Sequence, residues 1–334
     1  MGRHNGSDLD VAAADGGIED RQENGVDRAR LLAASSRTWY PRRRLQKMVL
    51  RRLHPGGSMT TMSGKVCLVT GGTSGIGRET AARLAELGAT VVVVGRDAER
   101  GRAAVKEIRH RAPSAEVDLL TADMSSLAEV RRLAAEVLEK YRRLDVLDNN
   151  AGVIVPKRQF TVDGYETTFA VNHLAPFLLT SLLRERLVAS APARVITVSS
   201  NAHGSAKQIP WDELARGEPS YPLSKLANIL FTVELARRLT GTGVVANCLH
   251  PGLIRTQLGR EARGVAKLLV AAAKPFMGTV QTGAATPVYL ASAPEAAEVT
   301  GGYFFRGRQV APSSLARDPE AAARLWALSE ELVA

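Results

Sequence analysis

Residues 65–77 have the sequence KVCLVTGGTSGIG, and this stretch decides the fold. Lys65 to Thr70 is a short apolar run that suits a strand buried on both faces. Glycines follow, and then a helical pattern from Arg78 to Leu87. A strand, a glycine-rich turn and a helix in this order are typical of phosphate binding, because glycine lets the backbone turn sharply and approach a pyrophosphate. The alternative is that the glycines only shape the turn.

Apolar runs and helical patterns alternate along the rest of the chain. Strands are expected at about residues 90–95, 115–121, 144–148, 194–199 and 303–306, and helices at about 98–110, 126–140, 282–291 and 319–333. Such alternation predicts βαβ units with right-handed crossovers. We therefore expect one α/β domain over residues 63–334, a single Rossmann-type doubly wound parallel sheet of about seven strands flanked by helices.

Tyr221 and Lys225 are four residues apart, a spacing that places both side chains on one face of a helix. A phenol titrates near ~10, too high for proton transfer at neutral pH. A nearby ammonium favours the phenolate and lowers that pKa. The pair is therefore a candidate acid/base unit.

Composition and charge exclude several other classes of protein. Of the 334 residues, 45% are hydrophobic and 23% charged, which is ordinary for a globular domain. The net charge is +10, but the basic residues of the domain interleave with acidic ones. This favours a solvated surface over a nucleic-acid site, so we expect no nucleic-acid partner. No apolar run is long enough for a transmembrane segment, and the histidines lack metal-ligand spacing.

The chain has two cysteines, Cys67 and Cys248, and both lie in apolar runs. Two buried thiols do not make a disulfide framework, so a reducing, cytoplasmic location is expected.

Residues 1–58 do not have the pattern of a folded domain. An acidic, glycine-containing stretch precedes a basic one at about residues 28–52, and His54 to Ser58 then interrupts any helix or strand. We expect a disordered basic N-terminal extension. Two alternatives are that translation starts at Met59 or Met62, so that the extension is not made, and that residues 42–53 contact a membrane surface.

Taken together, the motifs resemble those of the short-chain dehydrogenase/reductase family, over about residues 63–334. The flanking sequences are most similar to the retinol dehydrogenase and WW-domain oxidoreductase branch, as in residues 198–203, 224–228 and 250–252. The motifs that carry the resemblance are Thr70-Gly-x-x-x-Gly-x-Gly77, Asn149-Asn-Ala-Gly152, Asn172, Ser200, Tyr221-x-x-x-Lys225 and Pro251-Gly252 with Thr256.

The resemblance implies four catalytic residues. Tyr221 would exchange a proton with the substrate oxygen, and Ser200 would hold the same oxygen. Lys225 would lower the pKa of Tyr221 and bind the nicotinamide ribose, while Asn172 would organise a water that links Lys225 to solvent. Without the resemblance, Ser200 would be a strand-end hydroxyl and Asn172 a satisfied polar group. His173, His203 and His250 are not expected to act as bases.

The resemblance also implies where NADP(H) or NAD(H) would bind. Gly71, Gly75 and Gly77 would hold the pyrophosphate, Asp123 the adenine edge and Thr256 the carboxamide. The expected cofactor-binding residues are Gly71, Thr73, Ser74, Gly75, Ile76, Gly77, Arg96, Asp123, Met124, Asn150, Ala151, Gly152, Tyr221, Lys225, Pro251, Gly252, Ile254 and Thr256.

Arg96 and Asp97 follow the second strand and indicate opposite cofactors. A carboxylate here suits the ribose hydroxyls of NAD, and an arginine suits the 2′-phosphate of NADP. Because Asp97 is also a good N-cap for the helix that follows, we favour Arg96 and NADP(H) over NAD(H).

Three features depart from the family pattern. Asp148 replaces an apolar residue at a buried strand end, where a carboxylate needs a partner or a water. Pro176 cannot donate to the carbonyl of Asn172, so we expect a kinked helix that leaves this carbonyl free for the relay water. The segment between Ser200 and Tyr221 is shorter than in animal retinol dehydrogenases, which leaves retinoid specificity open.

Residues 257–280 have the pattern of an amphipathic lid over the substrate. Its few polar groups suggest an apolar carbonyl or alcohol; the alternatives are a homo-oligomer contact or a peripheral membrane contact. We therefore expect an NADP-preferring short-chain oxidoreductase that acts on an apolar alcohol or carbonyl. The alternative from another class is a cofactor-binding regulatory protein without turnover.

Overall fold

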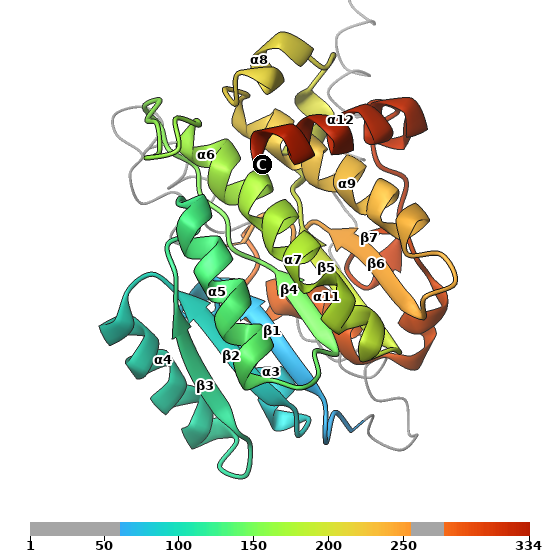
Figure 1. Ribbon diagram of the computed structural model, residues 1–334. Coiled ribbons are helices and arrows are strands. Elements are labelled where there is room, and N and C mark those ends of the chain that lie inside the picture. The colour runs from blue at the N-terminus through green and yellow to red at the C-terminus, as the bar shows by residue number, and fades with distance from the viewer. Residues whose placement is uncertain (1–60, 255–276) are drawn as a thin grey trace, which may run out of the picture. The chain divides into compact units, whose positions relative to one another are not determined.

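A computed structural model describes residues 61–254 and 277–334, which contain one sheet with the strand order β3-β2-β1-β4-β5-β6-β7-β8 (Figure 1). Neighbouring strands from β3 to β7 are parallel, and β8 pairs with β7 in the antiparallel sense. The predicted doubly wound parallel sheet is confirmed, with the short edge strand β8 in addition. The strands are β1 Val66–Thr70, β2 Thr90–Gly95, β3 Val117–Thr121, β4 Val146–Asn149, β5 Ala193–Val198, β6 Val244–Leu249, β7 Tyr303–Phe305 and β8 Arg308–Gln309.

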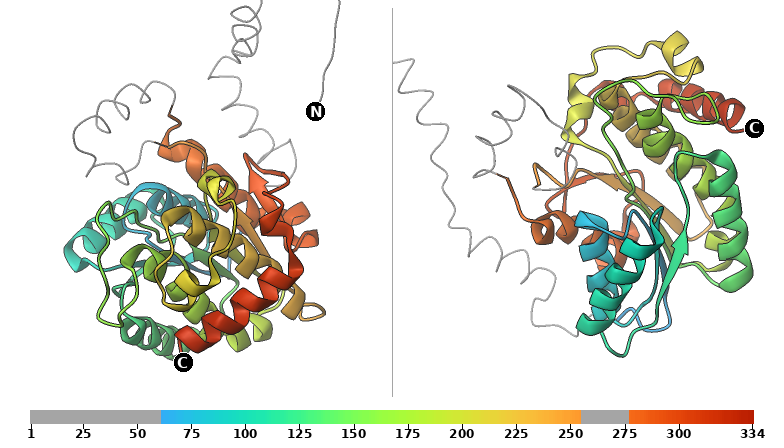
Figure 2. Two further views of the ribbon diagram at one scale, coloured as in Figure 1. Left: turned by 90° about the horizontal axis from the view of Figure 1, so that it is seen from above. Right: turned by 90° about the vertical axis from the view of Figure 1, so that its left-hand side faces the viewer.

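Helices cover both faces of the sheet, as Figures 1 and 2 show. On one face α5, α7 and α9 bury one apolar cluster, and α12 packs on α9; on the other face α3, α4 and α11 bury a second. The helices are α3 Gly75–Glu86, α4 Ala98–Arg111, α5 Leu127–Lys140, α6 Thr167–Phe169, η1 Ala170–Leu174, α7 Ala175–Ala189, η2 Asn201–Ser205, α8 Trp211–Ala215, α9 Tyr221–Arg238, α11 Val280–Ser292, η5 Pro294–Glu298, η6 Leu315–Arg317 and α12 Pro319–Leu332.

The strand order reverses between β1 and β4. From β1 the chain first proceeds outward through β2 and β3, and it then returns to add β4 on the other side of β1. The helices that follow β1 and β4, α3 and α7, therefore lie on opposite faces of the sheet, and open α/β sheets bind their ligands at such a reversal.

The first helix begins earlier than its apolar pattern indicated. The pattern predicts a helix from Arg78, whereas α3 begins at Gly75. Residues 75–77 are Gly-Ile-Gly, which has a low intrinsic helix propensity and shows no apolar period. The tertiary packing of α3 overrides this propensity.

The helix around Pro176 is not a regular α-helix. Residues Ala170–Leu174 form a π-helical turn, in which the Ala175 amide donates to the Ala170 carbonyl. Pro176 occupies the first turn of α7, where its missing N–H is tolerated. The π-turn interrupts the regular α-helix, and π-turns of this kind are common at functional sites, whereas the expected kink stays a prediction. A free Asn172 carbonyl stays a prediction.

Within residues 61–254 and 277–334, no helix is long and apolar enough to cross a membrane. Cys67 and Cys248 are buried free thiols, as the sequence predicted. The N-terminal extension, residues 1–58, lies outside the described residues, and the position of the translation start stays a prediction.

Candidate active site

The predicted site residues lie after the carboxyl ends of successive parallel strands. The glycine turn follows β1, Arg96 follows β2, Asp123 follows β3, Asn150 follows β4 and Ser200 follows β5. These ends meet at one edge of the sheet, and the reversal between β1 and β4 lies at its centre. Residues far apart in the sequence are therefore brought to one edge of the sheet.

The glycine turn leaves no room for side chains. Gly71 and Gly75 have the left-handed backbone (φ of 66° and 54°) that glycine adopts without strain. A Cβ on Gly71 would lie 2.9 Å from the Cα of Ala151, and one on Gly77 would lie 2.3 Å from Nδ2 of Asn150. The loops that follow β1 and β4 therefore pack directly on each other, with glycine at the contacts.

The N-terminus of α3 is bare, whereas two other helices of the same sheet are capped. Its N-cap Ser74 makes no side-chain cap hydrogen bond, and the first turn carries no acidic residue. In α4 and α5, by contrast, Asp97 and Ser126 accept hydrogen bonds from first-turn amides. A helix N-terminus with free amides attracts an anion, so the glycine turn and α3 fit the pyrophosphate of a dinucleotide.

Replacement of Gly77 by alanine tests this fit. The added Cβ would lie 2.5 Å from the Gly71 carbonyl oxygen and would push the two loops apart. We expect NADPH binding, measured by calorimetry, to weaken by about 10- to 100-fold, equivalent to ~1.4–2.8 kcal/mol. Gly204→Ala is the matched control, because a Cβ added to Gly204 would meet no atom within 4 Å and the φ of Gly204 is outside the left-handed region. Equal affinities for the two variants would contradict the assignment.

Thr70 is a residue whose role sequence reasoning missed. Its hydroxyl donates to the Asp148 carbonyl (3.2 Å) and accepts from the amides of Asn150 and Ala151 (both 3.1 Å). The Asn150 side chain in turn donates to the Thr70 carbonyl at 2.8 Å. Thr70 thus ties the end of β1 to the loop after β4; the only signal of this role in the sequence was its position at the start of the glycine motif.

Ser200, Tyr221 and Lys225 converge where β5 meets α9. Tyr221 begins α9, and Nζ of Lys225 lies 5.9 Å from the centroid of the Tyr221 ring. The Lys225 ammonium donates to the Val198 carbonyl at 3.0 Å, and the Ser200 side chain lies near enough to the Tyr221 phenol to affect its pKa. The sequence-predicted trio is therefore assembled by the structure.

Burial dominates the acid–base properties of this trio. It raises the pKa of Tyr221, and the Ser200 side chain opposes that rise. Burial lowers the pKa of Lys225 to about 8, because an ammonium is poorly solvated in the interior. Lys225 contacts the Val198 carbonyl rather than the phenol oxygen, so a lowering of the Tyr221 pKa by Lys225 stays a prediction.

Asn172 lies on the π-turn and is completely buried. Its Oδ1 accepts from the Val153 amide (2.8 Å), and its Nδ2 donates to the Val153 carbonyl and the Ser224 hydroxyl (both 3.1 Å). A Cβ on Gly152 would lie 3.2 Å from Oδ1 of Asn172 and 3.3 Å from Nζ of Lys225. Asn172 and Lys225 therefore approach each other across Gly152, and the Asn172 side chain is already engaged.

The neighbouring candidates are structural. Ser199 is buried and donates to the Lys225 carbonyl at 2.7 Å, so it holds α9 against β5. His173 lies in an aromatic cluster with Phe169 and Phe177, and burial lowers its pKa to about 4. Burial likewise lowers the pKa of His250 to about 4. The contacts of Ser199 and His173 are structural, and the expectation that His250 is not a general base stays a prediction.

Asp97 and Arg96 differ in their contacts. Oδ1 of Asp97 accepts from the amides of Glu99 and Arg100, both at 3.0 Å, and so caps α4 as the sequence predicted. Arg96 precedes it and is exposed at the carboxyl end of β2. At the next strand end, Oδ1 of Asp123 accepts from the Ser125 amide and hydroxyl, which orders the turn before α5.

The segment after β6 is described only as far as Ile254. Gly252 has φ of 86°, and the Gly278 amide donates to the Leu253 carbonyl at 2.8 Å, so the chain on both sides of residues 255–276 meets at this edge. Thr256 and most of the proposed lid, residues 257–280, lie outside the described residues.

Asp148 lies at a buried strand end, as the sequence predicted. It is fully buried in β4, between Val69 of β1 and Ile196 of β5. Neither carboxylate oxygen has a hydrogen-bond partner among the described residues, and the alternative, a contact with water, stays a prediction. Burial raises the pKa of Asp148 to about 8, and the group is mostly neutral at pH 7.

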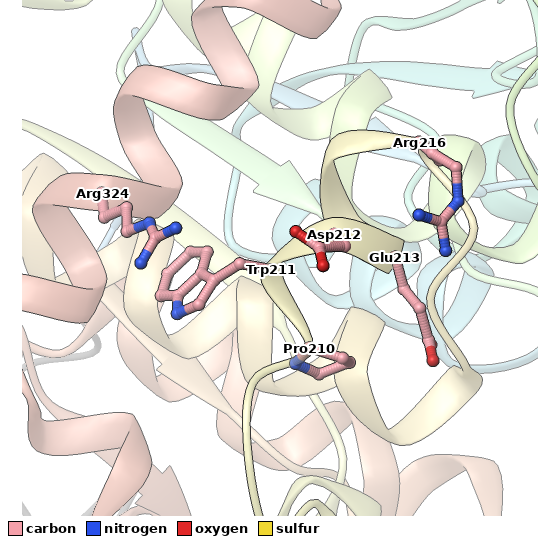
Figure 3. Close-up of a pocket in the computed structure, with 6 residues that line it drawn as sticks. All are labelled: Pro210, Trp211, Asp212, Glu213, Arg216 and Arg324. Atoms are coloured by element: carbon pink, nitrogen blue, oxygen red, sulfur yellow. The ribbon is translucent and has the colours of Figure 1, made fainter.

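A cavity of about 470 Å³ lies between α8 and α12, and none of the predicted site residues lines it (Figure 3). In it the Arg324 guanidinium lies 4.2 Å from the centroid of the Trp211 ring. This contact fixes the segment between Ser200 and Tyr221 onto the last helix.

Comparison with known proteins agrees with the geometry. The family model described as short chain dehydrogenase matches residues 65–265. Retinol dehydrogenase 13 of Homo sapiens is 44% identical over 287 residues, which cover 83% of this chain and 86% of that protein. The WW domain-containing oxidoreductase of Pongo abelii is 40% identical over 283 residues, which cover 81% of this chain and 68% of that protein.

A solved structure with the same fold is the RhlG/NADP active-site complex of Pseudomonas aeruginosa. It matches with a TM-score of 0.59 at 31% identity, over 73% of this chain and 95% of that chain. The glycine turn, Ser200, Tyr221 and Lys225 all lie inside the family match. The chain therefore belongs to the short-chain dehydrogenase family of NAD(P)-dependent oxidoreductases, and its relatives include the retinol dehydrogenases and the WW domain-containing oxidoreductases.

Proposed function

We propose that this enzyme is an NADP-preferring oxidoreductase that interconverts an apolar alcohol and its carbonyl, with Tyr221 as general acid and base. The observation that carries the proposal is the convergence of Ser200, Tyr221 and Lys225 at the sheet edge where the glycine turn also lies. A regulatory protein that only senses the cofactor has no need for proton-transfer groups.

Bound NADP(H) would supply or accept the hydride. During reduction Tyr221 donates its phenolic proton to the carbonyl oxygen of the substrate, and Ser200 hydrogen-bonds the same oxygen. During oxidation Tyr221 takes the proton back. Because the Asn172 side chain is engaged with Val153 and Ser224, a relay water at this residue would bind its main-chain carbonyl.

The NADP preference rests on the division of roles between Arg96 and Asp97. Oδ1 of Asp97 accepts hydrogen bonds from two amides of α4. Arg96, by contrast, is exposed at the end of β2, where a 2′-phosphate would lie. The Pseudomonas aeruginosa structure is an NADP complex, which supports the same choice.

Arg96→Ala tests the preference. Loss of a charge-assisted hydrogen bond of about 1.5–3 kcal/mol should weaken NADPH binding by roughly 10- to 100-fold and leave NADH binding within about twofold. Asp97→Ala is the control, since it should lower the free energy of unfolding by about 1 kcal/mol through the lost cap without reversing the preference. Tight NADH binding by the native chain, lost in Asp97→Ala, would instead assign the ribose to Asp97.

The apolar character of the substrate is supported by the loops at the same edge. Ile154 after β4 and Leu253 after β6 are exposed by 40% and 59%. The human relative is named for retinol, an apolar alcohol. We therefore place the substrate among apolar alcohols, aldehydes and ketones.

The deciding experiment is calorimetric titration of the purified chain with NADPH and NADH, followed by turnover assays on a panel of apolar aldehydes and ketones. We expect tight NADPH binding and NADPH oxidation with at least one member of the panel. Tight binding without turnover on any member, or on the corresponding alcohols, would favour the regulatory protein.

A further inference from the structure

We propose that His203 is a positioning residue for Ser200: its imidazole bridges the Ser200 carbonyl and the Ser313 amide, and so joins the catalytic serine to the C-terminal part of the chain. We call Ser200, His203 and Ser313 the His203 bridge. The role in turnover rests on the function proposed above.

The contacts of the ring determine its tautomer. Nε2 of His203 lies 3.1 Å from the backbone nitrogen of Ser313, which can only donate, so Nε2 must be the unprotonated nitrogen. Nδ1 then carries the proton and donates it to the Ser200 carbonyl at 2.8 Å. Both ring nitrogens are engaged, which excludes His203 as a general base.

The ring is also held from the side. It is 4% exposed, and its centroid lies 5.1 Å from that of Tyr303 at an interplanar angle of 74°. The Tyr303 hydroxyl lies 3.4 Å from Nδ1. The strand β7 and the segment after β8 thus fix the imidazole, and the imidazole fixes the residue that follows β5.

The turn that carries Ser200 needs such support. Ser200 is the N-cap of a short 3₁₀ helix, Asn201–Ser205, and the hydrogen bonds of a 3₁₀ helix are weaker than those of an α-helix. The Ser200 carbonyl accepts from the His203 amide at 3.2 Å as well as from Nδ1, while the Ser200 hydroxyl accepts from the Ala202 amide at 3.1 Å. Loss of the bridge would free the turn, and a displacement of about 1 Å at a substrate-binding group can lower turnover ~100-fold.

Three variants separate the two hydrogen bonds. His203→Asn places an amide N–H where Nδ1 lies and keeps donation to Ser200, whereas His203→Gln places an acceptor where Nε2 lies and keeps the bond from Ser313. His203→Ala removes both. We expect kcat to fall ~10- to 100-fold in the alanine and glutamine variants and within ~5-fold in the asparagine variant, at unchanged NADPH affinity.

Ser313→Ala is the control, since it removes a hydroxyl and keeps the amide that donates to His203; kcat should stay within about twofold. A residue that merely fills space would give the opposite order, because glutamine is closer to histidine in volume. A glutamine variant at least as active as the asparagine variant, or unchanged kcat in the alanine variant, would overturn the proposal.

The tautomer provides a readout without turnover. In protein with ¹⁵N-labelled histidine at pH 7, the His203 resonances, assigned by their loss in His203→Asn, should show the Nδ1–H form. His173 is the internal contrast: Ser329 donates its hydroxyl to the Leu325 carbonyl, so it accepts from Nε2–H of His173. An Nε2–H or charged His203 would overturn the bridge. If the native chain turns over no substrate, the proposed function fails, and the NMR result alone decides whether the bridge exists.

Discussion

Tyr221→Phe should abolish turnover while NADPH binding stays within about twofold of the native value. General acid–base catalysis by a positioned side chain contributes about 10²–10⁴-fold, and phenylalanine has no hydroxyl proton to transfer. The Ser199 hydroxyl donates to the Lys225 carbonyl, and both ring nitrogens of His203 are hydrogen-bonded. We therefore expect kcat to fall by ~10³-fold or more in steady-state assays of NADPH oxidation.

The direction of the Tyr221 pKa shift adds a pH dependence. Burial raises this pKa, so the phenol is protonated at neutral pH and suited to donate a proton during reduction. Carbonyl reduction should therefore be favoured at neutral and lower pH, and it should decline as pH rises through the Tyr221 pKa. Alcohol oxidation needs the phenolate and should rise over the same pH range.

Tyr165→Phe is the matched control. The Tyr165 hydroxyl donates to the Leu332 carbonyl at 2.6 Å, between the segment before α6 and the end of α12. Its loss should lower the free energy of unfolding by about 1 kcal/mol and leave kcat unchanged. Substantial residual turnover in Tyr221→Phe, with the native pH profile, would assign proton transfer to another group.

Asp148→Val should stabilise the protein by about 3–5 kcal/mol at pH 7, because it relieves the burial of an unpaired polar group. Valine matches the apolar neighbours of Asp148, Val69 and Ile196, and it suits a central strand. The Asp148 carboxyl group has no hydrogen-bond partner among the described residues, so its burial costs desolvation free energy. A valine side chain does not have this cost. Chemical unfolding monitored by circular dichroism would measure the gain.

The gain should depend on pH with a defined sign. The pKa of Asp148 is 3.8 for the free side chain and about 8 in the folded protein. Between these two values Asp148 binds a proton in the folded state but not in the unfolded state. The free energy of unfolding of the native chain is therefore highest below the lower pKa, and it falls by ~1.4 kcal/mol per pH unit as the pH rises to the upper one. The advantage of Asp148→Val should therefore grow by about 4 kcal/mol between pH 5 and pH 8.

Asp145, just before the same strand, offers a control of opposite sign. It is also buried, but Arg143, Lys65 and the Val66 amide hydrogen-bond it. Burial alone would raise the pKa of Asp145, and these bonds outweigh it and hold the pKa below its usual value. Asp145→Val should destabilise the protein at pH 7, with a loss that shrinks as pH falls. An equal, pH-independent effect of the two variants would show that Asp148 is not neutral in the fold.

The family match and the fold could be predicted because their signals are local. The apolar run 65–70, the glycines after it and the alternation of strands and helices need no distant residue to be recognised. The N-cap role of Asp97 was predictable for the same reason, since a cap acts only on the first turn of its own helix. The start of α3 was predicted too late, because tertiary packing decides whether a Gly-Ile-Gly turn is helical.

The environment of each site residue could not be predicted. Asp148 lacks a partner among the described residues because the two strands beside it present Val69 and Ile196, and the strand order decides which residues those are. Lys225 donates to the Val198 carbonyl because α9 crosses the end of β5. His203 meets Ser313 across a separation of 110 residues. Motif spacing by itself determined the family and predicted the candidate catalytic residues; only the tertiary structure decided pKa values, tautomers and supporting contacts, because these depend on burial and on neighbours distant in the chain.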